Sequence, residues 1–243
     1  MRLEIVGLRG LAEINEGDPL AELIRNQALH ENVPLGGTTV VVIAQKIVSK
    51  AEGAVVDLCT VEPSALARDW AAQWGKDARL IELILRQSRR IVKMDRGVLI
   101  AETHHGLVCA NAGVDRSNVP GGEFATILPA DPDASACRIR LGLGCGAVVI
   151  SDTFGRPWRE GLVNVAIGVS GLAAIQDYRG SRDREGRQLD GTVIALADEL
   201  AAAAGLLMPK SDGSPVVLIN GLRFAPGEGS RDLIRPPGRD LFR

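Results

Sequence analysis

Two aspartates follow apolar segments that are typical of strands, and each could hold a metal ion. Asp115 comes soon after residues 107–110, and Asp152 comes two residues after the end of residues 147–150. A carboxylate at the end of a strand can bind Mg²⁺ or Mn²⁺ against a phosphate. Two such carboxylates could share a metal site that stabilises the attacking and leaving oxygens of phosphoryl transfer.

The segment that contains Asp152 also offers a hydroxyl and two guanidinium groups. Thr153 follows Asp152, and Arg156 and Arg159 come shortly after. Carboxylate and hydroxyl oxygens suit one hard cation, and arginine suits a phosphate or a carboxylate. We predict that Asp152 and Thr153 bind metal and that Arg156 or Arg159 holds a carboxylate or phosphate of a substrate. The alternative is a surface loop with solvated arginines.

The segment around Asp115, residues 111–118, combines short polar side chains with a glycine. Such a segment leaves backbone groups open, and Asn118 could donate a hydrogen bond to a ligand. The alternative is an Asx-type turn between two strands.

Lysine is scarce, with five residues against 23 arginines, and two of the five lie close together. Lys46 and Lys50 are four residues apart, immediately after the β-branched run at residues 38–43. A lysine so placed suits a phosphate as a point charge. The alternative is an ordinary exposed lysine pair.

Composition narrows the choice of metal and of partner. The chain has 243 residues, a net charge of −2, 46% hydrophobic and 24% charged residues, so we expect a folded protein with no general attraction to nucleic acid. The four cysteines form no Cys-x-x-Cys, and there are three histidines, so oxygen ligands are the expected donors to a metal. No apolar run approaches the roughly 20 residues of a membrane span, and no signal-peptide core is evident. We expect a cytoplasmic protein that does not enter a membrane.

Helical and strand-like patterns alternate without a βαβ rhythm, which favours an α+β fold with mixed sheets. Asp18-Pro19 predicts a helix start, with the helix continuing to about residue 27. Leu66, Trp70 and Trp74 form a stripe that predicts a core-facing helix. Further helices are expected at residues 77–92, from residue 131 onward, and at residues 192–208. Strands are expected at residues 38–43, 97–100, 107–110 and 147–150.

Standard nucleotide-binding signatures are missing. No Gly-x-x-x-x-Gly-Lys-Ser/Thr occurs, and the glycine-rich residues 142–147 precede a strand, whereas a dinucleotide fingerprint follows one. A nucleotide, if bound, must be held by another arrangement.

Taken together, these segments resemble the CofE family, the coenzyme F-420-0:L-glutamate ligases. The resemblance covers essentially the whole chain. It is carried by residues 10–18, 46–53, 111–118, 131–135, 152–156, 197–199 and 240–242.

The resemblance implies a reaction and a fold. Members use GTP to attach L-glutamate, through its amine, to the carboxylate of a deazaflavin phospholactate, by way of an acyl phosphate. They use a divalent metal, Mg²⁺ or Mn²⁺, together with a monovalent cation such as K⁺. They are intertwined homodimers with an α+β fold of their own, so we expect a single ligase unit over residues 1–243 with two α+β lobes.

The resemblance also implies roles for residues at matching positions. The guanine nucleotide site would be lined by Leu11, Ala12, Glu13 and Ile14. The nucleotide phosphates would be contacted by Gln45, Lys46 and Lys50, with Lys50 drawing charge from the γ-phosphate. Metal would be bound by Asp115, Asp152 and Thr153, and the nucleotide also by Asn118. A last nucleotide and metal segment would include Lys210, Ser211 and Asp212.

That last segment departs from the family pattern, because Pro209-Lys210 stands where members usually have glycine followed by an acidic or amide residue. Proline also removes a backbone donor. Two alternatives therefore stay open: an amide ligase of the same fold that acts on another small carboxylate, and a nucleotide-binding protein without turnover. Hydrolysis of a phosphoester without any amino acid would indicate a phosphatase.

Overall fold

The fold is built on a five-stranded mixed sheet, seen in a computed structural model that describes residues 2–116, 123–209 and 214–240. The strand order is β1 (Glu4–Leu8), β12 (Val216–Asn220), β2 (Val40–Ala44), β8 (Ala147–Arg156) and β9 (Arg159–Ser170). β2 and β8 are parallel, and the other neighbours are antiparallel. An α+β fold is confirmed, and the two-lobe and dimer predictions stay predictions.

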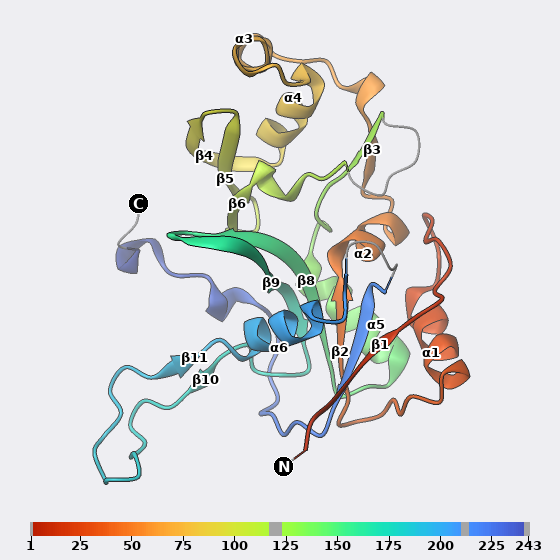
Figure 1. The fold of residues 1–243 in the computed structure, drawn as a ribbon, viewed down its shortest axis with the longest axis vertical. Coiled ribbons are helices and arrows are strands. Elements are labelled where there is room, and N and C mark those ends of the chain that lie inside the picture. Colours follow the sequence, from red (N-terminus) through yellow and green to blue (C-terminus); the bar gives the residue numbers. More distant parts are fainter. Residues whose placement is uncertain (1, 117–122, 210–213, 241–243) are drawn as a thin grey trace.

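Helices cover both faces of this sheet (Figure 1). One face packs against α1 (Leu20–His30), α2 (Gln45–Ala51) and α5 (Pro132–Leu143), and the other against α6 (Leu196–Gly205). Side chains of β2 alternate between the two cores, and Val40 to Ile43 are fully buried. The apolar run therefore forms a central strand that is buried on both faces.

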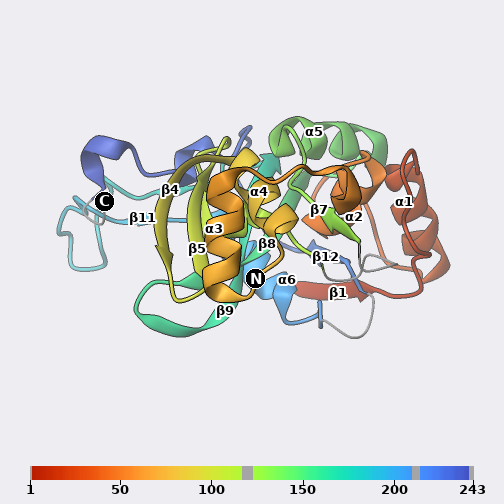
Figure 2. The same cartoon turned by 90° about the horizontal axis from the view of Figure 1, so that it is seen from above.

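A third core lies at the end of the molecule where α3 (Ala65–Trp74) and α4 (Ala78–Arg86) pack over a separate sheet (Figure 2). That sheet has the order β4 (Ser88–Asp95), β5 (Val98–Thr103) and β6 (Val108–Ala110), all antiparallel. Two short pairs complete the strands: β3 (Val55–Asp57) with β7 (Phe124–Thr126), and β10 (Gln176–Asp177) with β11 (Val193–Ile194). Short 3-10 helices lie at Leu58–Thr60, Asn111–Gly113, Arg231–Leu233 and Pro237–Arg239.

Several expected elements have different bounds. Asp18 does not cap α1, because its carboxylate accepts from the Asn15 backbone N–H at 2.8 Å and Pro19 is the N-cap. The helix expected at residues 77–92 ends at Arg86, and β4 begins at Ser88. Leu66, predicted to face the core, is 57% exposed. The last helix is shorter than predicted, at Leu196–Gly205.

β8 is longer than its apolar run and forms a hairpin with β9 that extends beyond the sheet (Figure 1). Ile150 pairs with Gly168 and Ser151 with Ala166, so Ile167 is an extra residue on β9. Such a bulge bends a strand and re-aims the side chains next to it. Asp152 therefore lies within a strand, just past the bulge, and not in the surface loop that the sequence also allowed.

The outer edge of β9 is closed by carboxylates from two helices. Asp133 of α5 accepts from the Val169 N–H at 2.8 Å, and Asp198 of α6 accepts from the Ala166 N–H at 2.9 Å. Because an open edge offers unpaired N–H groups to other chains, these contacts protect it. Among the described residues, no helix has the length and apolar character needed to cross a bilayer.

Candidate functional site

The candidate site lies where β2 ends beside β8. Ala44 pairs with Ser151, so Gln45 and Asp152, which follow them, leave the parallel pair at the same edge. The start of β12 is at this edge too, since the Ala44 N–H donates to the Pro215 carbonyl at 2.8 Å. Carboxyl ends of parallel strands are the usual place for ligands in mixed and parallel sheets.

Helix α2 begins directly after β2 and carries both candidate lysines. Val48 is fully buried against the sheet, and the Ser49 hydroxyl donates to the Gln45 side-chain carbonyl at 2.7 Å. Gln45 itself is 3% exposed. Its hydrogen bond to Ser49 therefore stabilises the first turn of α2 at the place where that helix meets the candidate site. Lys46 and Lys50, four residues apart, share one face of the helix.

Each lysine contacts a carboxylate from a different segment. The Lys46 ammonium lies 2.9 Å from the Asp115 carboxylate, and Lys50 forms an ion pair with Glu13. Lys50 is buried, whereas the Glu13 side chain is 67% exposed. These pairs bring the segments around residues 13 and 115 to α2, as the predicted nucleotide site requires.

The segment after β1, residues 11–14, has two residues packed in the core and two exposed to solvent. Ile14 is buried in the core beneath α1, and Leu11 packs against the same core. Ala12 and Glu13 are exposed. The segment is therefore anchored by its apolar ends, and Glu13 reaches Lys50.

Asp115 follows an unusual turn. Asn111, Ala112 and Gly113 all have left-handed backbone angles, with φ of 54°, 51° and 73°. Non-glycine residues in this region cost roughly 1–2 kcal/mol each, so packing must hold the turn. Backbone hydrogen bonds of 3.0 and 2.8 Å between Asp115 and Thr126 then fix the backbone that carries the Asp115 carboxylate.

Asp152 and Thr153 lie on β8 next to groups that the sequence did not indicate. The Thr153 hydroxyl donates to the Asn164 side-chain carbonyl at 2.9 Å across the hairpin. Burial raises the pKa of the Cys109 thiol to about 12, and the negative charge of Asp152 adds to this rise. Cys109 belongs to β6, the strand that leads to Asp115.

The donor set fits a hard cation. It comprises two carboxylates, the Thr153 hydroxyl and the Asn164 amide oxygen, all oxygen donors. Among the described residues no group of three His, Cys, Asp or Glu side chains could hold a metal. Mg²⁺ commonly binds through one or two carboxylates plus substrate phosphates, so this set suits a metal shared with a nucleotide.

Arg156 lies apart from these residues, at the end of the β8–β9 hairpin. Its guanidinium contacts the backbone carbonyls of Glu160 and Gly161. At a strand rise of about 3.3 Å per residue it is roughly 13 Å along β8 from Asp152. If Arg156 holds substrate, as predicted, it can therefore contact only a part of the substrate that is distant from the predicted metal ligands.

An ion-pair network on α4 holds the ends of the segment between Asp115 and β7. Arg79 contacts Glu123 at 2.9 Å and Asp77 at 2.8 Å, and Arg116 lies 3.9 Å from Asp77. The hydrogen bond from Arg79 lowers the pKa of Asp77. The predicted nucleotide contact Asn118 lies outside the described residues, as do Lys210, Ser211 and Asp212.

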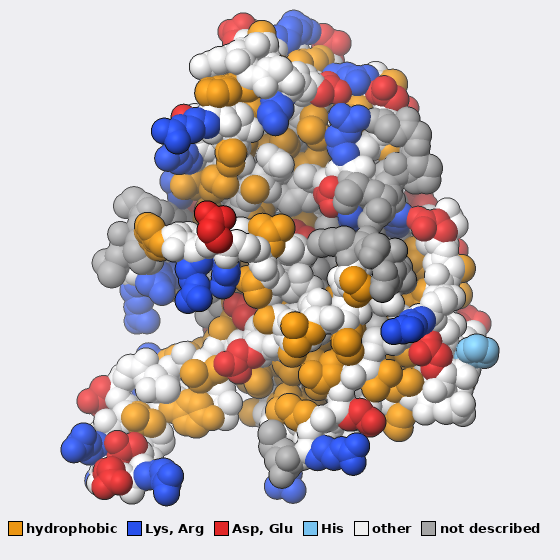
Figure 3. Space-filling view, viewed as in Figure 1, with side chains coloured by type: hydrophobic (Ala, Val, Ile, Leu, Met, Phe, Trp, Pro, Cys, Tyr) orange, Lys and Arg blue, Asp and Glu red, His pale blue; other side chains and the backbone are white. Residues whose placement is uncertain are grey.

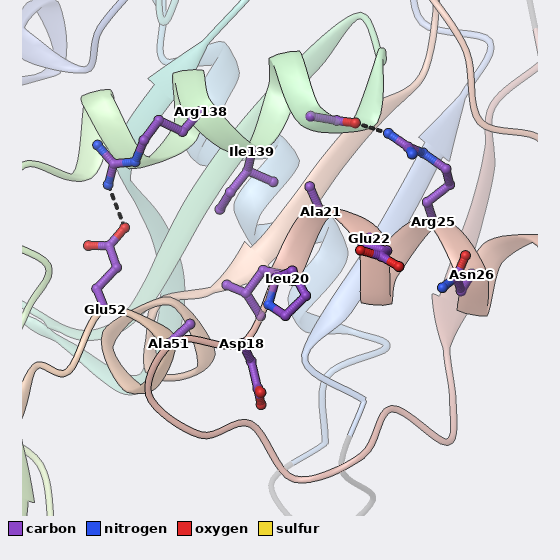
Figure 4. Close-up of a pocket in the computed structure, with 12 residues that line it drawn as sticks. Asp18, Leu20, Ala21, Glu22, Arg25, Asn26, Ala51, Glu52, Arg138 and Ile139 are labelled. Carbon is purple, nitrogen blue, oxygen red and sulfur yellow. Dashed lines mark hydrogen bonds and ion pairs between the residues drawn. The ribbon is translucent and has the colours of Figure 1, made fainter.

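A cavity of about 560 Å³ lies behind α2, between α1 and α5 (Figure 4). Its two arginines are already engaged: Arg138 with Glu52 at 2.7 Å, and Arg25 with the Gly142 carbonyl. None of the predicted site residues that the structure describes lines it. It is therefore separate from the strand edge, although the end of α2 forms part of its wall.

Comparison with known proteins gives consistent matches along the chain. Residues 10–221 match the family described as F420-0:Gamma-glutamyl ligase. A coenzyme F420:L-glutamate ligase of Methanopyrus kandleri is 45% identical over 255 residues, covering 100% of this chain and 98% of the relative. The protein of that name from Methanothermobacter thermautotrophicus is 45% identical over 252 residues, with 100% of both chains covered. That from Halorubrum lacusprofundi is 40% identical, covering 99% and 96%.

Proposed function

Because the chain belongs to the F420-0:gamma-glutamyl ligase family, we propose that it joins L-glutamate to the carboxylate of a deazaflavin phospholactate at the expense of GTP. The products are the γ-glutamyl coenzyme, GDP and phosphate. One observation carries the proposal. At the edge of the sheet where α2 begins, Lys46 lies 2.9 Å from the Asp115 carboxylate, and the pairing of Ala44 with Ser151 brings the backbone of Asp152 to the same edge.

The first step transfers a phosphoryl group. An oxygen of the acceptor carboxylate attacks the γ-phosphorus of GTP, and the bond from this phosphorus to the β-phosphate oxygen breaks. The products of this step are an acyl phosphate and GDP. Lys50 and Lys46 neutralise charge on the phosphates, and both side chains are carried by one helix whose backbone stays in place. A divalent ion held by Asp115, Asp152 and Thr153 would supply further positive charge to these oxygens.

The second step forms the amide. The uncharged amine of L-glutamate attacks the acyl carbon, and the carbon–oxygen bond to phosphate breaks after a tetrahedral intermediate. The amine loses a proton and phosphate departs. Holding the amine against the acyl phosphate and away from water is the main contribution of the protein here. Arg156 would bind a distant carboxylate or phosphate of a substrate.

We also propose a homodimer. Trp158 at the hairpin end is 79% exposed, with a left-handed φ of 58°, and Leu162 on β9 is 68% exposed. Leu206 after α6 is 82% exposed, and hydrophobic side chains gather on that face over α6 and the neighbouring strands (Figure 3). Such surface is typical of an interface. Sedimentation should give twice the chain mass, and a monomer at micromolar concentration would contradict the proposal.

The direct test is incubation with GTP, Mn²⁺, K⁺, L-glutamate and the unglutamylated coenzyme, followed by mass spectrometry. The wild-type protein should add glutamyl units to the coenzyme. Asp152→Ala should add none, even in excess Mn²⁺. Full ligation by Asp152→Ala would refute the metal assignment. GTP binding without turnover across a panel of amino acids would favour a binding protein, and turnover only with another carboxylate would favour a different amide ligase. Phosphoester hydrolysis without an amino acid would favour a phosphatase.

A further inference from the structure

One ion pair joins two residues that are predicted to bind different ligands. The Lys46 ammonium, predicted to contact phosphate, lies 2.9 Å from the carboxylate of Asp115, a predicted metal ligand. The Lys46 side chain is 19% exposed and that of Asp115 is 42% exposed, so solvent reaches the pair. A divalent ion approaching Asp115 therefore meets an ammonium group that is already there.

The backbones on both sides of this pair are fixed. Helix α2 is held by the buried Val48 and by the hydrogen bond between Ser49 and Gln45. Asp115 is held by its two backbone bonds to Thr126. The mobile element is therefore the flexible four-carbon stem of Lys46, which can turn its ammonium without moving either segment.

We propose that Lys46 makes metal binding and phosphate binding interdependent. In the free protein its ammonium neutralises Asp115 and competes with a divalent ion for that carboxylate. A nucleotide phosphate gives Lys46 a second anionic partner, which leaves Asp115 to the metal. Lys46 is thus a positioning residue that disfavours metal binding until the nucleotide is present. The identity of the phosphate ligand rests on the proposed function.

Thermodynamic linkage fixes the direction of the expected change in metal and nucleotide affinity, and the strength of the ion pair limits its size. If the phosphate weakens the hold of Lys46 on Asp115, metal affinity must rise with nucleotide, and nucleotide affinity must rise with metal by the same factor. An exposed ion pair contributes up to about 1 kcal/mol, which corresponds to a factor of roughly five in affinity. The other lysine serves as a contrast, because its partner Glu13 is not a predicted metal ligand.

The affinity for Mn²⁺ is measured by electron paramagnetic resonance for wild type and for Lys46→Gln. Each protein is titrated with Mn²⁺ alone and again in saturating GDP, and the second titration is corrected for Mn²⁺ that binds free GDP. Lys46→Gln should bind Mn²⁺ alone roughly fivefold more tightly than wild type, and GDP should strengthen Mn²⁺ binding less in the variant than in wild type. Lys93→Gln is the matched control, because Lys93 forms a surface ion pair with Asp95 at 3.8 Å on β4. Its Mn²⁺ affinity should equal that of wild type.

The reciprocal measurement protects against a misfolded variant. Asp115→Asn should bind GDP without metal more tightly than wild type, because Lys46 no longer has its carboxylate partner. Equal Mn²⁺ affinity of Lys46→Gln and wild type, or an equal effect of GDP on both, would overturn the inference. The Mn²⁺-alone comparison needs neither glutamate nor coenzyme, so a failed ligation assay beside a positive result here would count against the proposed function alone.

Discussion

At the scale of single residues, the candidate site depends on how charge is distributed over α2. Lys50 is buried at 8% exposure, whereas its partner Glu13 is largely open to solvent. A buried ammonium facing an exposed carboxylate can exchange that partner for a phosphate without becoming solvated. The pairing of each lysine with a carboxylate from a distant segment could not be predicted from sequence, because nothing local relates residue 50 to residue 13.

Replacement of Lys50 tests this role. Lys50→Met keeps the length and apolar packing of the side chain but removes the charge, so kcat should fall by about 100-fold, as for loss of one preorganised electrostatic contact. Steady-state kinetics with GTP as the varied substrate measures the change. Lys93→Met, on the exposed face of β4, should keep wild-type kinetics. Undiminished kcat in Lys50→Met would show that this ammonium does not act on the phosphates.

The left-handed turn before Asp115 makes a prediction about stability. An alanine Cβ at Gly113 would lie 2.6 Å from the Leu128 side chain, and φ is +73°. Gly113→Ala should lower the free energy of unfolding by roughly 2–4 kcal/mol, from the backbone strain and the overpacking together. Urea denaturation measures this loss.

Gly17 supplies the control for that measurement. Its φ is +84°, but an added Cβ would meet nothing within 4 Å. Gly17→Ala should therefore show only the backbone part, roughly 1–2 kcal/mol. Equal losses in the two variants would mean that Leu128 moves aside and that the turn is not held by packing.

At the scale of elements, the bulge on β9 is the feature that shapes the site. It occurs between Ile150 and Ser151 of the partner strand, just before Asp152. The N–H groups on the outer edge are taken up by Asp133 and Asp198 from two helices. Sequence indicated the apolar part of β8 but not its continuation, because residues 151–156 have the polar and glycine composition of a loop.

The junction of α3 and α4 predicts a pH dependence of stability. The Glu82 carboxylate accepts from the Ser64 backbone N–H at 3.0 Å and from Arg86 at 2.9 Å. Hydrogen bonding to Ser64, followed by that to Arg86, lowers the pKa of Glu82 from 4.5 to about 2. Between these values the unfolded chain binds more protons than the folded chain, so the stabilisation is complete above pH 4.5 and is lost as the pH falls toward 2.

Glu82→Gln should therefore be less stable than wild type at neutral pH, and the two stabilities should converge only as the pH falls to about 2. Chemical denaturation at a series of pH values measures both. Glu62→Gln is a suitable comparison, since the Glu62 side chain is 85% exposed and forms its ion pair with Arg68 on the surface. A constant difference between Glu82→Gln and wild type at all pH values would contradict the assignment.

Across the whole molecule, the sequence predicted where helices and strands lie better than it predicted which strands pair with each other. The buried strand after residue 38, the paired strands near residues 98–110 and the start of α5 at Asp131-Pro132 are confirmed. The insertion of β12, from the far end of the chain, between β1 and β2 was not predicted. Local periodicity shows which residues are buried, but it carries no information on which distant strand supplies the neighbour.

The same limit applies to the candidate site. Asp115, Asp152 and the α2 lysines could be identified because each lies near the end of an apolar run. Their convergence depends on the parallel pairing of β2 and β8 and on the left-handed turn before Asp115. Both are long-range or packing-determined features, and Asn164 and Cys109 have no local signal at all.

We propose that the groups at this strand edge activate a carboxylate by phosphorylation and then join it to the amine of glutamate. This proposal is tested most directly with an acceptor whose carboxylate carries ¹⁸O at both oxygens, incubated with GTP, Mn²⁺ and L-glutamate and analysed by mass spectrometry. We expect one ¹⁸O in the released phosphate for each first glutamate added, and no product without GTP. Glutamylated product with unlabelled phosphate, or no product under these conditions, would contradict it.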